Sequence, residues 1–296
     1  MRLVSFAALI GVCLPCVAGA QVEAAGYTAD ECPPCAGWNA SQPPVPLFGN
    51  TFWVGTRGLG AVLVTSSAGH VLVDGGLPES VPLILSAIRE LGFEPRDVRA
   101  IVNSHAHYDH AGGIAGLQEA TGATVFATAA SAFALRSGVL TAEDPQKDTA
   151  LAYPSVPRVE VIADGEAVRV GPLALTAHLT PGHSPGGTTW SWNSCEGGRC
   201  LDLVYADSQT PVSDDGFRYS MGDRTERFER GLEVIEGLAC DILLTPHPGA
   251  SGLWDRVAAR DQGDPEALVD SAACVRYAER YRQRLRERLE RERGGG

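Results

Sequence analysis

Apolar and polar residues follow two different periods along this chain, and segments with the two periods alternate. Short apolar runs rich in β-branched residues predict buried strands at 52–55, 61–65, 70–74, 98–103, 123–128, 188–192, 201–206 and 241–244, with further strands across 159–179. Apolar residues spaced three or four apart predict helices at 80–91, 113–120, 129–137, about 225–238 and 264–291. Asp264 is the predicted N-cap of the last helix, with Pro265 in its first turn. This alternation indicates an α/β domain whose polar motifs lie on loops after strand ends.

The first fifty residues lack such a period. Residues 1–20 begin with Arg2, continue with a mostly apolar stretch and end in small residues, which is the pattern of a cleaved secretory leader. The apolar stretch is too short to span a bilayer, and no other segment is long and apolar enough to do so. We therefore predict a leader at 1–20 cleaved near Ala20, an N-terminal arm at 21–48 and one domain at 49–296. The predicted protein is periplasmic and has no membrane contact.

Composition and charge narrow the classes of partner. The 296 residues include 24 Lys and Arg against 36 Asp and Glu, which gives a net charge of −12, and 44% of them are hydrophobic. Such a chain forms a globular core, and its acidic surface would repel nucleic acid and anionic lipid. Glu residues interleave with the Arg residues of 276–293, which favours a solvated helix face over a basic patch. We expect a small-molecule partner and a monomer.

Three of the seven histidines lie within six residues, in the segment HAHYDH at 105–110. Imidazole and carboxylate groups are ligands that zinc and related divalent ions prefer. Two later histidines, His183 and His247, also follow predicted strands and stand in turns rich in Pro and Gly. Together these groups supply three protein ligands to each of two metals. Such a set predicts a two-metal hydrolytic site, in which the metals lie about 3.5–4 Å apart.

The segment HAHYDHAGG resembles the H-x-H-x-D-H signature of the metallo-β-lactamase superfamily, and TPGHSPGGTTW and LLTPHPG resemble its later ligand motifs. The resemblance covers roughly residues 49–280. It implies an αβ/βα four-layer sandwich of the α/β class, in which two mixed β-sheets face each other and helices lie outside. It also implies two zinc ions, the first held by His105, His107 and His183, and the second by Asp109, His110 and His247.

The superfamily includes β-lactamases, thioesterases, lactonases and nucleases, so the signature leaves the substrate open. Thioester hydrolases such as glyoxalase II place a metal-bridging Asp after a strand, where this chain has the segment YADS at 205–208. Aligned on that strand, Ser208 takes the bridging position and Asp207 falls one residue early, on the opposite face. The lack of a bridging carboxylate resembles subclass B3 β-lactamases. With the register shifted by one, Asp207 bridges the metals, and a lactonase or thioesterase is the better interpretation.

The resemblance to subclass B3 implies an exported zinc β-lactamase that confers antibiotic resistance. A hydroxide held by the two zincs, oriented by Asp109 as catalytic residue, would attack the lactam carbonyl. Ser208 and Thr210 occupy the positions that bind the substrate carboxylate in that subclass, although ordinary polar residues at a strand end explain them equally well. A zinc-sequestering protein is a third hypothesis, but a storage site would have closed coordination.

Six cysteines would remain after removal of the leader, in a compartment where disulfides persist. Cys195 and Cys200 can join across a hairpin turn. Cys240 and Cys274 resemble the disulfide pair of subclass B3 enzymes, which would stabilise the fold by about 3–4 kcal/mol. The sequence leaves three interpretations of the CPPC motif at 32–35: a disulfide, a redox pair and a metal site. The last two alternatives lack the sequence context that they need.

Overall fold

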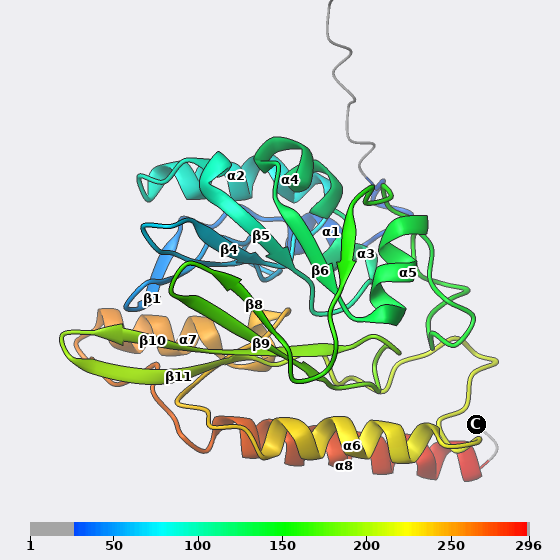
Figure 1. Ribbon diagram of the computed structural model, residues 1–296. Coiled ribbons are helices and arrows are strands. Elements are labelled where there is room, and N and C mark those ends of the chain that lie inside the picture. The colour runs from blue at the N-terminus through cyan, green and yellow to red at the C-terminus, as the bar shows by residue number, and fades with distance from the viewer. Residues whose placement is uncertain (1–26, 295–296) are drawn as a thin grey trace, which may run out of the picture.

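Two β-sheets stacked face to face form the centre of the computed structural model, which describes residues 27–294 (Figure 1). The predicted leader and the first residues of the predicted arm lie outside the described residues. The first sheet contains, in spatial order, β1 (Val45–Phe48), β2 (Thr51–Trp53), β3 (Val62–Val64), β4 (His70–Val73), β5 (Val98–Val102), β6 (Thr124–Ala127) and β7 (Val159–Val161). The second sheet contains β12 (Ile242–Leu244), β11 (Arg199–Tyr205), β10 (Thr188–Glu196), β9 (Leu173–Leu179) and β8 (Ala167–Val170).

Both sheets are mixed. In the first sheet β1 to β4 pair antiparallel and β4 to β7 pair parallel, and in the second sheet only β11 and β12 are parallel. The central strands β3 and β4 are buried along their whole length, because one face meets the other sheet and the opposite face meets helices. Their apolar residues therefore run together, as the sequence pattern predicts.

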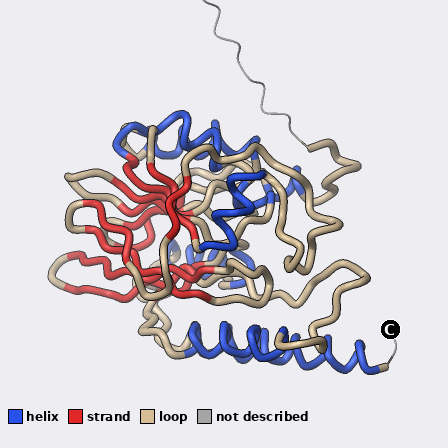
Figure 2. The backbone as a smooth tube through the Cα atoms, turned by 45° about the vertical axis from the view of Figure 1, so that its right-hand side comes forward, coloured by secondary structure: helices blue, strands red, loops and turns tan. Residues whose placement is uncertain are grey.

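Helices cover the outer faces of the sheets, so that the molecule has four layers (Figures 1 and 2). The helices on the first sheet are α2 (Val81–Glu90), α4 (Ile114–Thr121) and α5 (Ala129–Ser137), and those on the second are α6 (Arg224–Glu236) and α8 (Ala273–Arg293). The remaining helices are α1 (Cys35–Trp38), α3 (Tyr108–Ala111) and α7 (Leu253–Asp261), with 3₁₀ turns at Pro78–Ser80, Pro95–Asp97 and Pro248–Ala250. The predicted αβ/βα sandwich is confirmed. Within 27–294, no helix has both the length and the apolar character that a bilayer-crossing segment needs.

The first sheet begins earlier than the sequence predicts. The predicted arm ends at residue 48, but β1 lies inside it and pairs antiparallel with β2. The strand escaped prediction because it has only four residues and includes Pro46. Proline is tolerated there because β1 is the edge strand, where one side of the backbone needs no partner within the sheet.

The last helix begins later than predicted. Asp264 and Pro265 do not start it, and α8 begins at Ala273. Leu268 belongs to the core between the sheets, whereas Cys274 packs in the core between the second sheet and its helices. The chain crosses from one core to the other between these two residues, so a continuous helix from Asp264 could not bury both.

Three disulfides join six cysteines of the described part of the chain. Cys195 and Cys200 lie opposite each other on β10 and β11, and Cys240, just before β12, is joined to Cys274 on α8. The CPPC motif also forms a disulfide, between Cys32 and Cys35. Both of its cysteines are buried, and because they are joined to each other they offer no free thiolate to a metal.

Replacing Cys240 and Cys274 together by Ser should lower the free energy of unfolding by about 3–4 kcal/mol, because the bridge closes a long loop in the unfolded chain. Urea unfolding under oxidising conditions measures the change. The matched control is the double replacement Cys195→Ser and Cys200→Ser. It should cost less, because those cysteines are 5 residues apart in sequence and the first pair is 34 apart. An unfolding midpoint equal to that of the unmodified protein would contradict a stabilising role for the Cys240–Cys274 bridge.

Glu292, near the end of α8, fixes the loop that precedes α6. Its carboxylate accepts hydrogen bonds from the backbone N–H groups of Tyr219 and Ser220, both at 2.9 Å, and from Arg288 Nε at 2.8 Å. Partial burial raises the pKa of Glu292, but these hydrogen bonds outweigh burial and lower it to about 2. The folded protein therefore favours the ionised form more strongly than the unfolded chain does.

Glu292→Gln should therefore destabilise the protein in a pH-dependent way. The contribution of Glu292 is fully present above its ordinary pKa of 4.5 and is lost as the pH falls toward about 2. The difference in unfolding free energy between the original protein and the variant should be larger at pH 7 than at pH 3. Urea titrations at the two pH values measure it, and equal differences would show that the carboxylate is not the stabilising group.

Candidate metal centre

The six predicted ligands come from three loops that meet at one end of the sandwich. The segment HAHYDH follows β5, His183 lies between β9 and β10, and His247 follows β12. Figure 2 shows that loops gather on one side of the strands. Five of the six side chains are buried, and His247 is partly exposed. The structure therefore brings together side chains that lie up to 142 positions apart in the sequence.

A short helix separates the two halves of the HAHYDH segment. The backbone is extended at His107, which occupies the N-cap position of α3, and Asp109 and His110 belong to that helix. His105 and His107 therefore project from extended chain, whereas Asp109 and His110 project from a helical turn. This change of backbone direction lets one six-residue segment supply side chains to two neighbouring groups.

The first group consists of His105, His107 and His183. One ring nitrogen from each lies within 4.8 Å of the others, close enough for all three to bind a single metal ion. The ring centroids are 4.7 Å apart for His105 and His107, 4.9 Å for His105 and His183, and 4.8 Å for His107 and His183. Three imidazoles with the fourth position open are a common arrangement around catalytic zinc.

The second group consists of Asp109, His110 and His247. Asp109 Oδ2 lies 3.1 Å from His110 Nε2 and 3.2 Å from His247 Nε2, and the two ring nitrogens are 3.2 Å apart. The Asp109 oxygen and the two histidine nitrogens are thus close enough together to bind one metal ion. The ring centroid of His105 is 4.5 Å from that of His110, so the two groups are direct neighbours.

The chemistry of these groups fits divalent metal. His105 Nε2 is buried without a hydrogen-bond partner, which a metal ion would supply. Burial holds the pKa of His105 well below its usual value, and burial together with neighbouring His107 lowers the pKa of His183 to about 3, so both rings are neutral, as metal ligands must be. Burial raises the pKa of Asp109, but the charge and hydrogen bonds of His110 and His247 outweigh it and hold that pKa well below its usual value. Imidazole and carboxylate groups together are a zinc donor set.

Residues 60–266 match the family model of the metallo-β-lactamase superfamily. The chain belongs to this superfamily. It is similar to the solved structure of the Rm3 metallo-β-lactamase, with 48% identity and a TM-score of 0.87 over 88% of this chain and 99% of that one. It is also similar to MEM-A1, a subclass B3 metallo-β-lactamase from a soil metagenome library, with 43% identity and a TM-score of 0.86 over 88% of this chain and 100% of that one.

A curated relative of a different kind matches more weakly. The hydroxyacylglutathione hydrolase of Anaeromyxobacter dehalogenans (strain 2CP-C) is 32% identical over 130 residues, which are 44% of this chain and 40% of that protein. The chain thus spans less than half the length of this curated relative. The solved metallo-β-lactamases, in contrast, are matched over nearly their whole length.

Each histidine of the first group makes a hydrogen bond through one ring nitrogen, which leaves the other ring nitrogen for a metal. His105 Nδ1 lies 2.8 Å from Asp207 Oδ1, and His107 Nε2 lies 3.1 Å from Asp144 Oδ1. His183 Nδ1 donates to the backbone carbonyl of Thr210 at 2.8 Å. In metal sites such bonds fix the ring orientation and the tautomer of the histidine.

Asp207 does not bridge the two groups. Its Oδ1 atom contacts His105 Nδ1, whereas the unpartnered Nε2 of His105 is the nitrogen left for a metal. The carboxylate is fully buried, and a Cβ at Gly187 would lie 2.3 Å from its Oδ2 atom, so only glycine fits beside it. Burial, and then the nearby charge of Asp74, raise the pKa of Asp207 well above its usual value. The sequence-based prediction placed Asp207 on the face away from the metals by assuming that the strand continues to residue 207. The strand β11 ends at Tyr205, so that prediction did not include the contact of Asp207 with His105.

A second buried carboxylate, Asp74, connects the sheets beside the metal ligands. Asp74 Oδ1 accepts a hydrogen bond from the backbone N–H of Ser104 at 2.7 Å, and Oδ2 accepts from Ser104 Oγ at 2.7 Å and from Tyr205 Oη at 2.9 Å. Asp74 has φ of 60°, a left-handed conformation that no other non-glycine residue of the described chain adopts. Its role was not predicted, although the Asp at the end of the apolar run HVLVD is a signal visible in the sequence.

The predicted substrate-binding residues lie on the loop after Asp207. Ser208 is buried and Thr210 is partly exposed, and the carbonyl of Thr210 is the partner of His183.

Two residues that no motif indicated also lie at the site. Gln146 Nε2 lies 3.4 Å from His107 Nδ1 and 3.5 Å from His183 Nε2, and the ring centroid of Trp38 is 5.1 Å from that of His247.

Replacing Asp207 by Asn should weaken zinc binding about 10- to 100-fold, because the amide cannot hold His105 Nδ1 as a carboxylate does. Competition with a chromophoric zinc chelator measures the affinity. Thermal unfolding of the metal-free protein is the control, since the fold should remain intact. Unchanged zinc affinity in a folded variant would show that the Asp207–His105 contact has no part in metal binding.

Proposed function

We propose that this chain is an exported, zinc-dependent β-lactamase of subclass B3, which hydrolyses the amide bond of the β-lactam ring and so confers antibiotic resistance. The observation that carries the proposal is a pair of neighbouring groups of three ligands, which Asp207 does not join because it instead contacts His105. Its occurrence in a fold shared with metallo-β-lactamases at 43–48% identity supports the same substrate class.

The proposed site holds two zinc ions, one with His105, His107 and His183, and one with Asp109, His110 and His247. Bound zinc would lower the pKa of water to about 7 and polarise a carbonyl oxygen. Asp109 is the proposed catalytic residue. Its low pKa keeps it ionised at neutral pH, so that it can accept a hydrogen bond from the attacking water and orient that water toward the lactam carbonyl.

Substrate binding is assigned to the two loops that border the site. Ser208 and Thr210 supply hydroxyl groups that can donate hydrogen bonds to the substrate carboxylate. The amide of Gln146, from the opposite loop, lies beside two of the proposed ligands and can contact the substrate as well. The protein is proposed to act as a monomer in the periplasm after removal of residues 1–20, with the residues before β1 as an arm that precedes the domain.

A lactonase or thioesterase is the alternative function, and the partial match to a hydroxyacylglutathione hydrolase is the observation that favours it. Against it stands the position of Asp207, because the alternative rests on this carboxylate joining the two metals. Its Oδ1 atom contacts His105 Nδ1, whereas the nitrogen of that ring left for a metal is Nε2. We therefore treat the alternative as an outcome of the test below.

The purified chain without residues 1–20 should hydrolyse a penicillin and a carbapenem, lose this activity on chelation and regain it when zinc is restored. His247→Ala should lower turnover by at least about 100-fold, a loss typical of a metal-site residue. His178→Ala is the matched control, since His178 contacts Ser191 on the second sheet and should leave turnover unchanged. Absence of turnover despite two bound zincs would overturn the β-lactamase and favour a lactone or thioester substrate.

A further inference from the structure

Two long loops border the metal centre, and neither contains regular secondary structure apart from turns. The first, residues 138–158, connects α5 to β7, and the second, residues 206–223, connects β11 to α6. Both lie at the right of Figure 1. We propose that Asp214 is a positioning residue that locks these loops together and thereby holds Asp144 and Gln146 in place beside the metal ligands.

Asp214 makes three hydrogen bonds from the second loop to the first. Its Oδ2 atom accepts from the backbone N–H of Asp148 at 2.7 Å, and its Oδ1 atom accepts from Thr149 Oγ1 at 2.6 Å. Its own backbone N–H donates to the carbonyl of Pro145 at 2.7 Å. The residue is 8% exposed, although Asp148 and Thr149 around it are exposed. A nearly buried carboxylate with short bonds to two donors is a strong and directional connection.

The first loop carries two groups to the site within four residues of these bonds. Asp144 contacts His107 Nε2, and one of its oxygens also accepts from the backbone N–H of Gln146 at 2.9 Å. The side chain of Gln146 then reaches His107 Nδ1 and His183 Nε2. The positions of both side chains therefore depend on where Pro145 is held, and Asp214 is bonded directly to Pro145.

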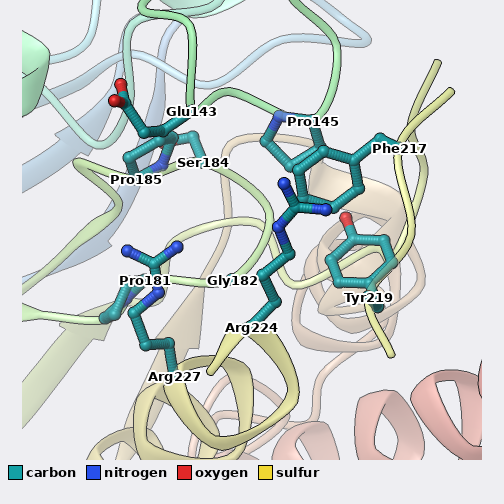
Figure 3. A pocket seen from close by; sticks show the side chains of 10 residues that line it. All are labelled: Glu143, Pro145, Pro181, Gly182, Ser184, Pro185, Phe217, Tyr219, Arg224 and Arg227. Atoms are coloured by element: carbon teal, nitrogen blue, oxygen red, sulfur yellow. The ribbon is translucent and has the colours of Figure 1, made fainter. Parts of the chain in front are cut away.

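The two loops also line a common small cavity. A small cavity of about 20 Å³ lies between Pro145 on the first loop and Phe217 and Tyr219 on the second. Figure 3 shows this cavity, with the guanidinium of Arg224 reaching up beside Phe217. The hydrogen bonds of Asp214 connect the segment 145–149 to the second loop directly.

The second loop is itself anchored to the body of the protein, so it is a suitable support. Arg288 on α8 donates to Ser213 Oγ at 2.7 Å and to the carbonyl of Phe217 at 3.2 Å. Hydrogen bonds therefore connect α8 to the second loop, the second loop to the first through Asp214, and the first loop to His107 through Asp144. Loss of Asp214 would leave the first loop free to shift relative to the metal ligands.

The test compares Asp214→Ala with Asp215→Ala. Asp215 is the neighbouring exposed acid and makes no hydrogen bond or ion pair within the described chain, so it controls for charge and for substitution in this loop. Hydrogen exchange of the peptide 138–153 in the zinc-loaded protein reports on the lock without any substrate. Exchange in this peptide should be at least about 10-fold faster in Asp214→Ala, because exchange rates follow local opening.

Steady-state kinetics then report on positioning, and this part rests on the proposed β-lactamase function. KM for a penicillin should rise about 5- to 10-fold in Asp214→Ala with a smaller change in kcat, because substrate contacts on the loop are loosened. Asp214→Asn should recover most of the loss, since the amide can accept from Asp148 N–H and donate to Thr149 Oγ1. At saturating zinc, the zinc content of Asp214→Ala should equal that of Asp215→Ala, so that the change in KM does not come from loss of metal.

The outcomes separate the two proposals. Equal exchange in Asp214→Ala and Asp215→Ala would overturn the lock, whatever the kinetics. Faster exchange with unchanged KM would overturn the positioning role. Faster exchange in a protein that hydrolyses no β-lactam would support the lock and contradict the proposed function alone.

Discussion

The buried carboxylate of Asp74 joins the two sheets at the edge where the metal ligands lie, and the rest of the site is built on that junction. Ser104, bonded twice to Asp74, directly precedes His105, and Tyr205, bonded once, lies two residues before Asp207. The His105–Asp207 pair is therefore positioned from both sheets through one side chain. Burying a carboxylate is costly unless donors surround it, and here a backbone N–H, two hydroxyl groups and the amide of Asn103 surround it.

Negative charge accumulates around the six ligands. Asp74, Asp109, Asp144 and Asp207 are all buried, and the ion pairs recorded for them within residues 27–294 involve only histidines, never Lys or Arg. Burial first, and the charge of Asp74 second, raise the pKa of Asp207. A divalent cation at the site would offset part of this negative charge.

The roles of residues that belong to a contiguous motif could be predicted from the sequence. The roles of residues that depend on tertiary contacts could not. The strands, most helices and the grouping of HAHYDH with His183 and His247 follow from local patterns, because period and turn residues are local properties. Asp144 and Gln146 lie in a loop of about twenty residues without any period, so only the folded chain shows what they contact. The true start of α8 depended on which core buries Leu268, which is likewise a tertiary property.

The partner of His183 differs in kind from the partners of His105 and His107. Those two histidines are held by side chains, whereas His183 is held by the main-chain carbonyl of Thr210. Any residue at position 210 retains that carbonyl. The side chain at position 210 can therefore change during selection for new substrates without loss of the hydrogen bond that supports His183. The substrate-facing side chain and the support of a metal ligand can thus evolve independently at this position.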